Sequence, residues 1–257
     1  MSASDSDVAW LEADWPVPGR VRALTTLRTG GVSGGPFASL NLGARVGDDP
    51  GAVAANRQRL ANAAGLPAEP VWLRQIHGVR VVRAGDPVAE DTEADAAFTD
   101  RPGVVCAVLT ADCLPVFLAR TDGSAVAVAH AGWRGLAAGV IESTVAALDP
   151  EQGPLAAWLG PAIGPDAFEV GPEVREAFVV RHPEDESAFR AGHGDRYLAD
   201  LYALARARLG RAGVTEVSGG GRCTYTDEAA FFSHRRDGLS GRMASLIWLS
   251  SEDADGS

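Results

Sequence analysis

Three apolar runs follow one another in the middle of the chain: Val104–Thr110 (VVCAVLT), Leu114–Ala119 (LPVFLA) and Ala125–His130 (AVAVAH). Each is rich in β-branched or other apolar residues and is bounded by turn residues, a pattern typical of β-strands. Six further runs share this pattern, namely Val21–Leu27, Val71–Ile76, Val79–Arg83, Ala94–Thr99, Leu155–Gly160 and Leu246–Leu249.

Four segments around these runs have the periodicity of helices. They are Gly51–Ala64, preceded by Asp49 as N-cap and Pro50, and Leu136–Leu148, Pro172–Val180 and Leu198–Gly210. Strands outnumber helices and are interleaved with them, which predicts an α+β fold with mixed β-sheets rather than a Rossmann fold or a barrel. Because no long linker interrupts the chain, we expect one domain over residues 1–257, with disorder at 1–7 and 251–257.

The charge of the chain excludes several classes of function. All 23 basic residues are arginine, against 34 acidic residues and a net charge of −11. Without lysine there is no Schiff-base enzyme, P-loop NTPase or protein kinase of the usual type. The acidic balance disfavours nucleic-acid and membrane-surface binding, so small molecules are the expected partners. The chain shows neither a signal-peptide pattern nor an apolar run of membrane-spanning length, which predicts a cytoplasmic protein.

Three metal-ligand residues stand at the ends of predicted strands: His77, Cys113 and His130. Their spacings of 36 and 17 residues suit three neighbouring strands, each of which delivers one ligand. Two imidazoles and a thiolate fit zinc and leave the fourth tetrahedral position open for catalysis. Two other interpretations stay open: hydrogen-bonded structural side chains, and a Cys113 nucleophile paired with a histidine.

The motifs around these residues resemble those of the YfiH family. In order they are Arg74–Gly78 (RQIHG), Ala94–Ala96 (ADA), Thr110–Pro115 (TADCLP), His130–Gly135 (HAGWRG), Gly160–Gly164 (GPAIG) and Phe231–Gly238 (FFSHRRDG). The resemblance extends from Leu27–Ser33 (LRTGGVS) and Ser39–Gly43 (SLNLG) to Gly241–Ala244 (GRMA). Two departures are His234, where the family more often has tyrosine, and the absence of a cysteine from residues 165–171.

This resemblance implies an α+β fold, in a single YfiH-like domain, with sheets sandwiched between helix layers. It also implies zinc ligands at His77, Cys113 and His130. The family, long labelled a laccase domain or multicopper polyphenol oxidase, is described as purine nucleoside phosphorylases with adenosine deaminase activity. The substrates implied are adenosine, inosine, guanosine and methylthioadenosine, together with phosphate. A murein-related substrate is a further alternative, and the oligomeric state is left open.

Each of the two reactions demands particular side chains. Deamination needs a metal-activated water and a carboxylate that carries the proton, for which Asp112 and Asp95 are the candidates. Phosphorolysis needs cationic groups around phosphate, and without lysine this role falls to arginine, backbone N–H groups or the metal. The candidate arginines are Arg134, which is also a catalytic candidate, and Arg28, Arg235 and Arg236. Ser33, Asn41 and Gln75 are expected to hydrogen-bond purine or ribose.

Two alternative functions follow from the same trio. A multicopper oxidase needs a trinuclear cluster with about eight further histidines, and this chain has five in all. A single copper in place of zinc would instead give a copper-dependent polyphenol oxidoreductase. A non-enzymatic scaffold that only holds a metal is the other alternative.

Overall fold

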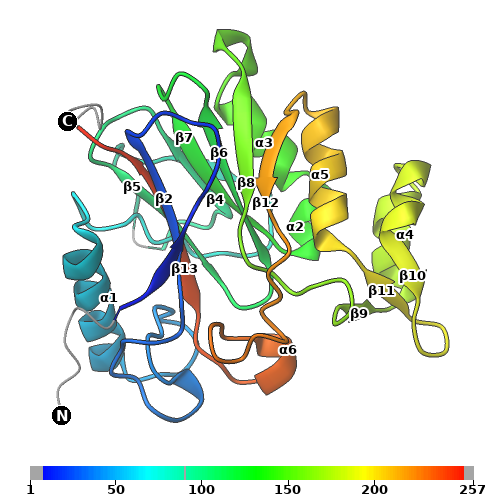
Figure 1. Ribbon diagram of the computed structural model, residues 1–257, viewed down its shortest axis with the longest axis horizontal. Helices are drawn as coiled ribbons and strands as arrows, with labels where there is room; N and C mark the ends of the chain where they lie inside the picture. The colour runs from blue at the N-terminus through cyan, green and yellow to red at the C-terminus, as the bar shows by residue number, and fades with distance from the viewer. Residues whose placement is uncertain (1–7, 90, 252–257) are drawn as a thin grey trace.

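Two β-sheets packed face to face form the centre of the computed structural model, which describes residues 8–89 and 91–251 (Figure 1). In spatial order, the larger sheet contains β12 (Glu216–Gly219), β8 (Leu155–Leu159), β6 (Leu114–Arg120), β7 (Val126–Ala131), β4 (Ala96–Thr99) and β3 (Val81–Arg83). The second contains β1 (Trp10–Glu12), β2 (Val21–Thr26), β13 (Met243–Leu249) and β5 (Val105–Thr110). Pairs β3–β4 and β8–β12 are parallel and the others antiparallel, so the larger sheet is mixed.

The central strand β6 shows why both faces of the larger sheet are buried. Val116 and Leu118 join one apolar cluster, whereas Phe117 and Ala119 join another. Successive side chains of a strand point to opposite faces, so an uninterrupted apolar run can serve two cores. One core lies between the two sheets, and the other lies between the larger sheet and its helices.

Helices cover the two outer faces of the paired sheets (Figure 1). On the larger sheet lie α2 (Trp133–Ala138), α3 (Val140–Ala147) and α5 (Leu201–Arg211). On the smaller sheet, α1 (Pro50–Ala64) buries Leu60 against Leu24 and Leu246. The predicted α+β fold with mixed sheets between helix layers is therefore confirmed.

A small third sheet lies at the edge of the molecule (Figure 1). It contains β10 (Phe189–Ala191), β11 (Tyr197–Ala199) and β9 (Glu169–Val170), and α4 (Pro172–Val179) lies beside it. The short helix α6 (His234–Asp237) precedes β13. Three 3₁₀ turns complete the assigned helices among the described residues, at Gly35–Phe37, Pro150–Gln152 and Pro183–Ala188.

Two predicted helices have different bounds in the structure. The run Leu136–Leu148 is split, because Gly139 adopts a φ of 107° that ends α2 and precedes α3. The predicted helix Leu198–Gly210 begins only at Leu201, because Leu198 pairs within the third sheet and the Asp200 side chain caps the helix by accepting the Ala203 N–H. The helices predicted at Gly51–Ala64 and Pro172–Val180 are confirmed to within one residue.

The predicted strand Val71–Ile76 is wrong. This segment makes only two isolated bridges, from Val71 to Cys106 of β5 and from Arg74 to Glu93 near β4. It therefore passes from one sheet toward the other and cannot keep a continuous ladder with either. The other eight predicted strands exist, with their ends shifted by up to three residues.

Five strands and α6 were not predicted. The strands are β1, β9, β10, β11 and β12, each of four residues or fewer. Such short strands carry too few alternations for a period-two pattern to stand out. The disorder predicted at 1–7 and 251–257 falls outside the described residues, except at Ser251, which forms a bend. None of the helices in the described ranges has the length and apolarity needed to span a membrane.

Candidate functional site

The three predicted metal ligands lie together at one end of the larger sheet. Cys113 ends the turn between β5 and β6, and His130 is the penultimate residue of β7, paired with Pro115 of β6. His77 lies in the loop that follows the bridging segment and adopts a left-handed φ of 60°. The expectation of three neighbouring strands is therefore correct for two ligands and wrong for His77, which a loop delivers.

The ligand atoms of the trio face one another. All lie within 4.8 Å of each other, and His77 Nε2 is 3.8 Å from Cys113 Sγ. The imidazole rings of His77 and His130 meet edge to face, with centroids 4.7 Å apart. In a tetrahedral zinc site, ligand sulfur and nitrogen atoms lie about 3.5 Å apart. The donor set therefore suits a metal ion such as zinc, whose binding would draw these atoms slightly closer together.

The carboxylate of Asp95 holds two of the ligands in place. It is completely buried and accepts a hydrogen bond of 2.8 Å from His130 Nδ1, which leaves His130 Nε2 for a metal. It also accepts the backbone N–H groups of Ile76, His77 and Gly78, at 3.2, 2.9 and 2.6 Å. Such support of a ligand histidine by a carboxylate is characteristic of metal sites.

Charge coupling within the trio prepares the thiol for metal binding. Burial alone would raise the pKa of Cys113, but the positive charge and hydrogen bonding of His130 and His77 lower it to about 6. Burial would likewise lower the pKa of His130, and the neighbouring Cys113 and Asp95 raise it instead. The pKa of Asp95 is lowered against the effect of burial, by His130 and by the amides of Gly78 and Ile76. A thiolate is the form of cysteine that binds metal.

Gly132 provides the space that the trio occupies. A Cβ atom at this position would lie 2.7 Å from His77 Cδ2 and 2.9 Å from Cys113 Sγ. Both distances are shorter than real Cβ contacts, so any side chain at residue 132 would displace two ligands.

The trio opens into a cavity of about 550 Å³, a size suited to a small molecule. Four arginines line it, Arg45, Arg57, Arg134 and Arg242, together with His234 and Thr110. None of the described residues that line it is Asp or Glu, although the whole chain carries a net charge of −11. The cavity is therefore a cationic region in an acidic protein.

Of the predicted arginines, the structure places Arg134 in the cavity. Its guanidinium stacks over Trp133 at 4.4 Å, at the start of α2, and the side chain is exposed. Arg45, Arg57 and Arg242 were not identified from the sequence. Arg45 and Arg57 stand outside the recognised motifs, and Arg242 lies in the GRMA motif, whose pattern does not tell that its side chain faces the cavity.

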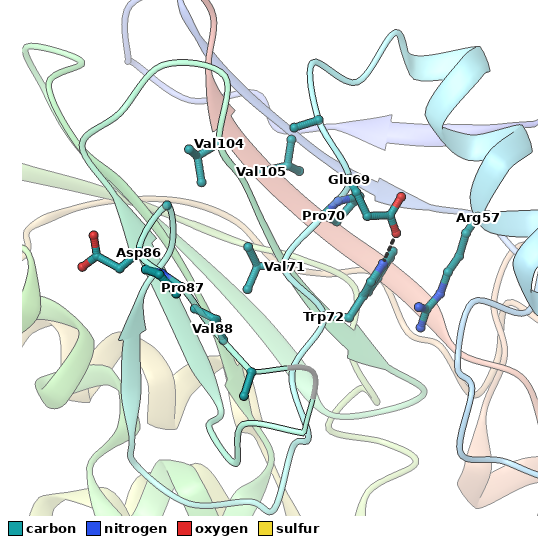
Figure 2. Close-up of a pocket in the computed structure, with 13 residues that line it drawn as sticks. Arg57, Glu69, Pro70, Val71, Trp72, Asp86, Pro87, Val88, Val104 and Val105 are labelled. Atoms are coloured by element: carbon teal, nitrogen blue, oxygen red, sulfur yellow. Dashed lines mark hydrogen bonds between the residues drawn. The ribbon is translucent and has the colours of Figure 1, made fainter.

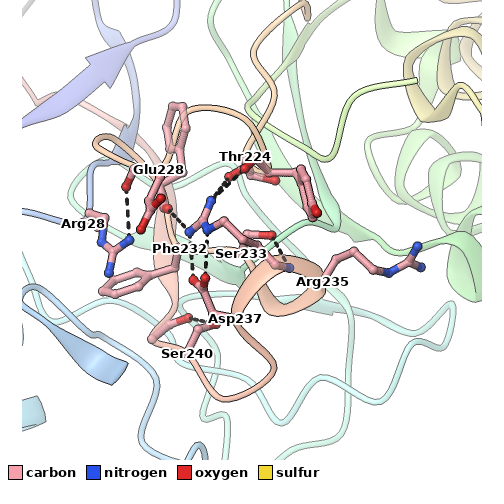
Figure 3. A network of polar contacts seen from close by, with 12 residues as sticks. Arg28, Thr224, Glu228, Phe232, Ser233, Arg235, Asp237 and Ser240 are labelled. Carbon is pink, nitrogen blue, oxygen red and sulfur yellow. Dashed lines mark hydrogen bonds and ion pairs between the residues drawn. The ribbon is translucent and has the colours of Figure 1, made fainter. Parts of the chain in front are cut away.

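The other three predicted arginines bind backbone carbonyl groups of the protein, as Figure 3 shows for Arg28 and Glu228. Arg28 donates to Ala38 O and Glu228 O and lies 4.7 Å from the ring of Phe232. Arg236 donates to three carbonyl groups and to Asp237, and Arg235 donates to Glu169 O. None of the three lines the cavity, so their predicted contact with substrate has no support in these contacts.

The predicted polar recognition residues have partners within the protein. Ser33 and Asn41 are buried, and both bind the carboxylate of Asp48, at 2.6 and 2.9 Å. Gln75 lines the cavity, but its carboxamide is paired with the N–H and C=O of Leu109 at the end of β5. The buried hydroxyl of Thr110, by contrast, lines the cavity and has no hydrogen-bond partner among the described residues.

Asp112 connects the cysteine turn to the loops that follow β12. Its carboxylate accepts from Thr224 Oγ1 at 2.6 Å and from the Arg235 N–H at 2.7 Å, and its backbone φ is 103°. Neither Asp112 nor Asp95 lines the cavity. Their predicted role in proton transfer stays a prediction.

A second and larger cavity, of about 720 Å³, shares part of its lining with the first; Figure 2 shows the residues that line it. Arg57 and Trp72 line both cavities, and the Arg57 guanidinium stacks 4.1 Å from the Trp72 ring. The rest of its lining is mainly apolar, with the carboxylates of Glu69 and Asp86. It contains no histidine or cysteine among the described residues.

The two remaining histidines lie away from the trio. His182 faces Glu184 and His193 faces Glu169. His77, Cys113 and His130 are the one group of three or more metal-ligand residues in residues 8–89 and 91–251. The described part of the chain thus offers a single metal centre and no second cluster of the kind a trinuclear copper site needs.

Comparisons with known proteins agree with this architecture. A family model described as multi-copper polyphenol oxidoreductase laccase matches residues 22–250. A purine nucleoside phosphorylase of Pseudomonas aeruginosa is 57% identical over 94% of this chain and 98% of its own length. The purine nucleoside phosphorylase YfiH of Escherichia coli K12 is 55% identical over 91% and 96%.

Solved structures resemble the fold over nearly its whole length. A Neisseria meningitidis protein, 51% identical, superimposes with a TM-score of 0.90 over 94% of this chain and 99% of its own. YlmD from Geobacillus stearothermophilus is 34% identical and superimposes with a TM-score of 0.86 over 94% of this chain and 96% of its own.

Proposed function

The chain belongs to the YfiH family, whose model is described as multi-copper polyphenol oxidoreductase laccase, and on that premise we propose that it is a zinc-dependent purine nucleoside phosphorylase. Its substrates are adenosine, inosine, guanosine and methylthioadenosine, which phosphate cleaves into the base and the corresponding ribose 1-phosphate. Adenosine deamination at the same site is part of the proposal. The observation that carries it is the cavity, in which a metal-type trio meets four arginines and no carboxylate of the described residues.

The arginines suit the charges that change in phosphorolysis. A phosphate oxygen forms a bond to the anomeric carbon while the bond from that carbon to the purine nitrogen breaks, and the purine takes the electron pair and a proton. The protein must therefore hold phosphate close to the sugar and compensate for the water that this charged group loses on binding. Guanidinium groups do this through paired hydrogen bonds, and Arg134 and Arg242 line the cavity without an ion pair to any carboxylate of the described residues.

The trio would hold zinc, which would supply Lewis-acid chemistry beside the substrate. The protein's own contribution is to keep the ligands in position: Asp95 fixes the tautomer of His130 and, through three amides, the turn that carries His77. The Thr110 hydroxyl is available to hydrogen-bond a ribose hydroxyl or a purine edge.

For deamination, a carboxylate has to accept and return a proton. We retain Asp112 and Asp95 as the candidates for this step because they adjoin the trio through Cys113 and His130. Asp95 also has the positioning role described above, and a variant at this residue would affect both reactions. Asp112 offers the cleaner test, because its side chain contacts Thr224 and Arg235 rather than a ligand side chain.

The test is incubation of pure, metal-analysed protein with adenosine, with and without phosphate. Phosphorolysis gives adenine and ribose 1-phosphate only when phosphate is present. Deamination gives inosine without phosphate, and with phosphate it gives inosine together with hypoxanthine from the cleavage of that inosine. Absence of any product at full metal occupancy would contradict the proposal. A product pattern limited to inosine would remove the phosphorylase and leave the deaminase.

The description of the family model favours a second candidate, a copper-dependent polyphenol oxidoreductase. Copper(II) binds imidazole and thiolate ligands more tightly than zinc does, so the same trio suits it. This alternative predicts copper in the isolated protein and oxygen uptake with phenols. Zinc in the protein, with nucleoside cleavage and no oxygen uptake, excludes it.

A further inference from the structure

We propose that Arg242 forms the phosphate subsite of the cavity, that it binds the anion through the Nε–Nη2 edge of its guanidinium, and that Asn41 and Gly43 hold this edge in place. The inference rests on the phosphorolysis proposed above, and it assigns the anion to a residue that neither the motifs around the trio nor the predicted arginines had indicated.

The guanidinium of Arg242 is anchored on one side and free on the other. Nη1 donates to the carbonyl groups of Ser240 and Gly241, at 2.8 and 3.0 Å, and also lies 3.4 Å from the Ser240 hydroxyl. Nε and Nη2 make no hydrogen bond within the described residues, and this guanidinium forms no ion pair there. The Nε–Nη2 edge presents two parallel N–H groups, the arrangement that binds two oxygens of a phosphate.

The surroundings of Arg242 favour an anionic ligand. The residue is half-buried and lines the cavity with Cys113 and Arg134. Burial lowers the pKa of its guanidinium, while the nearby Cys113 and Asp112 act in the opposite direction, and arginine stays protonated in such sites. A partly desolvated cation without a bonded carboxylate gains most from an anion that enters the cavity.

Arg242 differs in this respect from the other arginines of the cavity. Arg45 pairs with the carboxylate of Asp91, and Arg57 donates twice to Leu42 O while it stacks on Trp72. Arg134 is exposed and lies over Trp133. Arg242 is the one of the four that combines partial burial with a fixed guanidinium and a free bidentate edge.

Asn41 fixes the backbone from which this side chain extends. Its Oδ1 accepts the N–H groups of Arg242 and Gly43, at 2.9 and 3.0 Å, and its Nδ2 donates to Asp48 and to Gly43 O. The Leu42 N–H donates to Arg242 O. Asn41, predicted to contact substrate, is thus a buried positioning residue that joins the segment around residue 242 to the loop at 41–43.

Gly43 leaves room for the stem of the same side chain. A Cβ atom at residue 43 would lie 2.8 Å from Arg242 Cγ and 3.2 Å from its Cβ. These are the inner atoms of the side chain, which cannot move aside without redirecting the guanidinium. Gly43→Ala is therefore a way to displace Arg242 without changing its charge.

The primary experiment measures inorganic phosphate binding to metal-replete protein by calorimetry, without nucleoside, together with the KM values for phosphate and for inosine. We expect Arg242→Gln to weaken phosphate binding about 10- to 100-fold, since it removes a charged bidentate contact. Arg242→Lys keeps the charge but not the paired donors and should fall between wild type and Arg242→Gln. The KM for inosine should change less than about threefold. Arg83→Gln, which removes an exposed ion pair with Asp100, is the control.

The positioning roles are tested in the same assays. Asn41→Ala and Gly43→Ala should raise the KM for phosphate about 3- to 10-fold at unchanged zinc content, with a smaller effect on the KM for inosine. Asn62→Ala, an exposed asparagine on α1, is the control for Asn41. If Asn41 had only a structural role, Asn41→Ala would instead lower kcat and thermal stability and would raise the KM values for phosphate and inosine together.

The outcomes separate this inference from the proposed function. Wild-type protein that binds phosphate through Arg242 but cleaves no nucleoside would refute the phosphorylase and leave the anion subsite standing. Folded, zinc-replete Arg242→Gln protein with wild-type phosphate affinity would overturn the subsite even if phosphorolysis is real. If Arg242→Gln does not fold, wild-type phosphate affinity in both Arg242→Lys and Gly43→Ala overturns it instead. Absence of phosphate binding to the wild type also overturns it.

Discussion

The two cavities of this protein share a wall and differ in chemistry. Arg57 stacked on Trp72 lines both, yet the larger cavity of about 720 Å³ has valines, prolines and two carboxylates (Figure 2), whereas the smaller, of about 550 Å³, has the trio and four arginines. Size alone would select the larger cavity as the functional site. The smaller cavity is selected instead by its chemistry, because ionisable groups with shifted pKa values, Cys113 and His130, meet four arginines there.

The difference also shows how an acidic protein builds an anion site. The chain excludes Asp and Glu from the described lining of the smaller cavity and places Asp95 and Asp112 just behind the lining. There they orient ligands and loops without facing the substrate. The larger cavity exposes Glu69 and Asp86, which would repel phosphate.

The strongest test of the contrast is removal of the thiolate. We expect Cys113→Ala to lose the metal and to lower kcat/KM for nucleoside cleavage by more than about 100-fold, since one of three protein ligands is gone. Elemental analysis and the phosphorolysis assay measure both effects. Cys223→Ala is the matched control, because Cys223 lies outside the trio and accepts from the Gly164 N–H. Retention of both zinc and activity in Cys113→Ala would refute the site.

The next largest effect is expected at the buried carboxylate. Asp95→Asn keeps the shape but loses the charge that three amides and His130 share, so metal affinity should fall about 10- to 100-fold. Competition with a chelator of known zinc affinity measures this change. Asp100→Asn, at an exposed ion pair with Arg83, should leave zinc affinity as in the wild type. Equal affinities in the two variants would show that Asp95 does not support the metal.

A smaller effect is expected at the shared wall. Trp72→Ala removes the surface on which Arg57 stacks and joins the two cavities, so the KM for inosine should rise about 3- to 10-fold while kcat changes little. Steady-state kinetics with inosine check this prediction. An unchanged KM would mean that the wall does not shape the site. A fall in kcat without a change in KM would show that Trp72 acts on the chemical step rather than on substrate binding.

The smallest effect is expected from a valine that lines only the larger cavity. Val88→Ala alters its lining without touching the smaller cavity, so kcat and both KM values should stay within about twofold of wild type. The free energy of unfolding should fall by about 1 kcal/mol, because Val88 packs partly buried against the core between the sheets. Kinetics and denaturant unfolding test the two statements. A large change in kcat or KM would show that the larger cavity takes part in the reaction, and it would contradict the assignment of function to the smaller cavity alone.

The sequence predicted what depends on local pattern. The three central strands and the fold class were recognisable from their apolar runs, and two members of the trio stand where these runs begin or end, Cys113 just before β6 and His130 near the end of β7. The absence of lysine correctly pointed to arginine as the cationic group of the cavity. Longer elements with uniform periodicity, such as α1, were predicted almost to the residue.

Long-range packing determined the rest. Arg242 is 112 or more residues from every member of the trio, and its segment reaches the cavity through the pairing of β13 with β5 and hydrogen bonds to Asn41 and Leu42. Arg28, Arg235 and Arg236 stood in recognisable motifs, but their guanidinium groups bind backbone carbonyl oxygens of the protein, as Figure 3 shows for Arg28 and Glu228. A motif alone does not tell whether its polar side chains face a ligand or the backbone.

The close approach of Gly132 to His77 and Cys113 also bears on how fast a bound ion can exchange. The glycine backbone lies against one side of the trio and the buried Asp95 against another, so an ion would enter and leave through the cavity proposed for the nucleoside. Metal and substrate would then use the same route into the site. Protein saturated with nucleoside would therefore lose its metal to a chelator more slowly than the free protein. In the cell, the fraction of protein that keeps its metal would rise with the concentration of substrate.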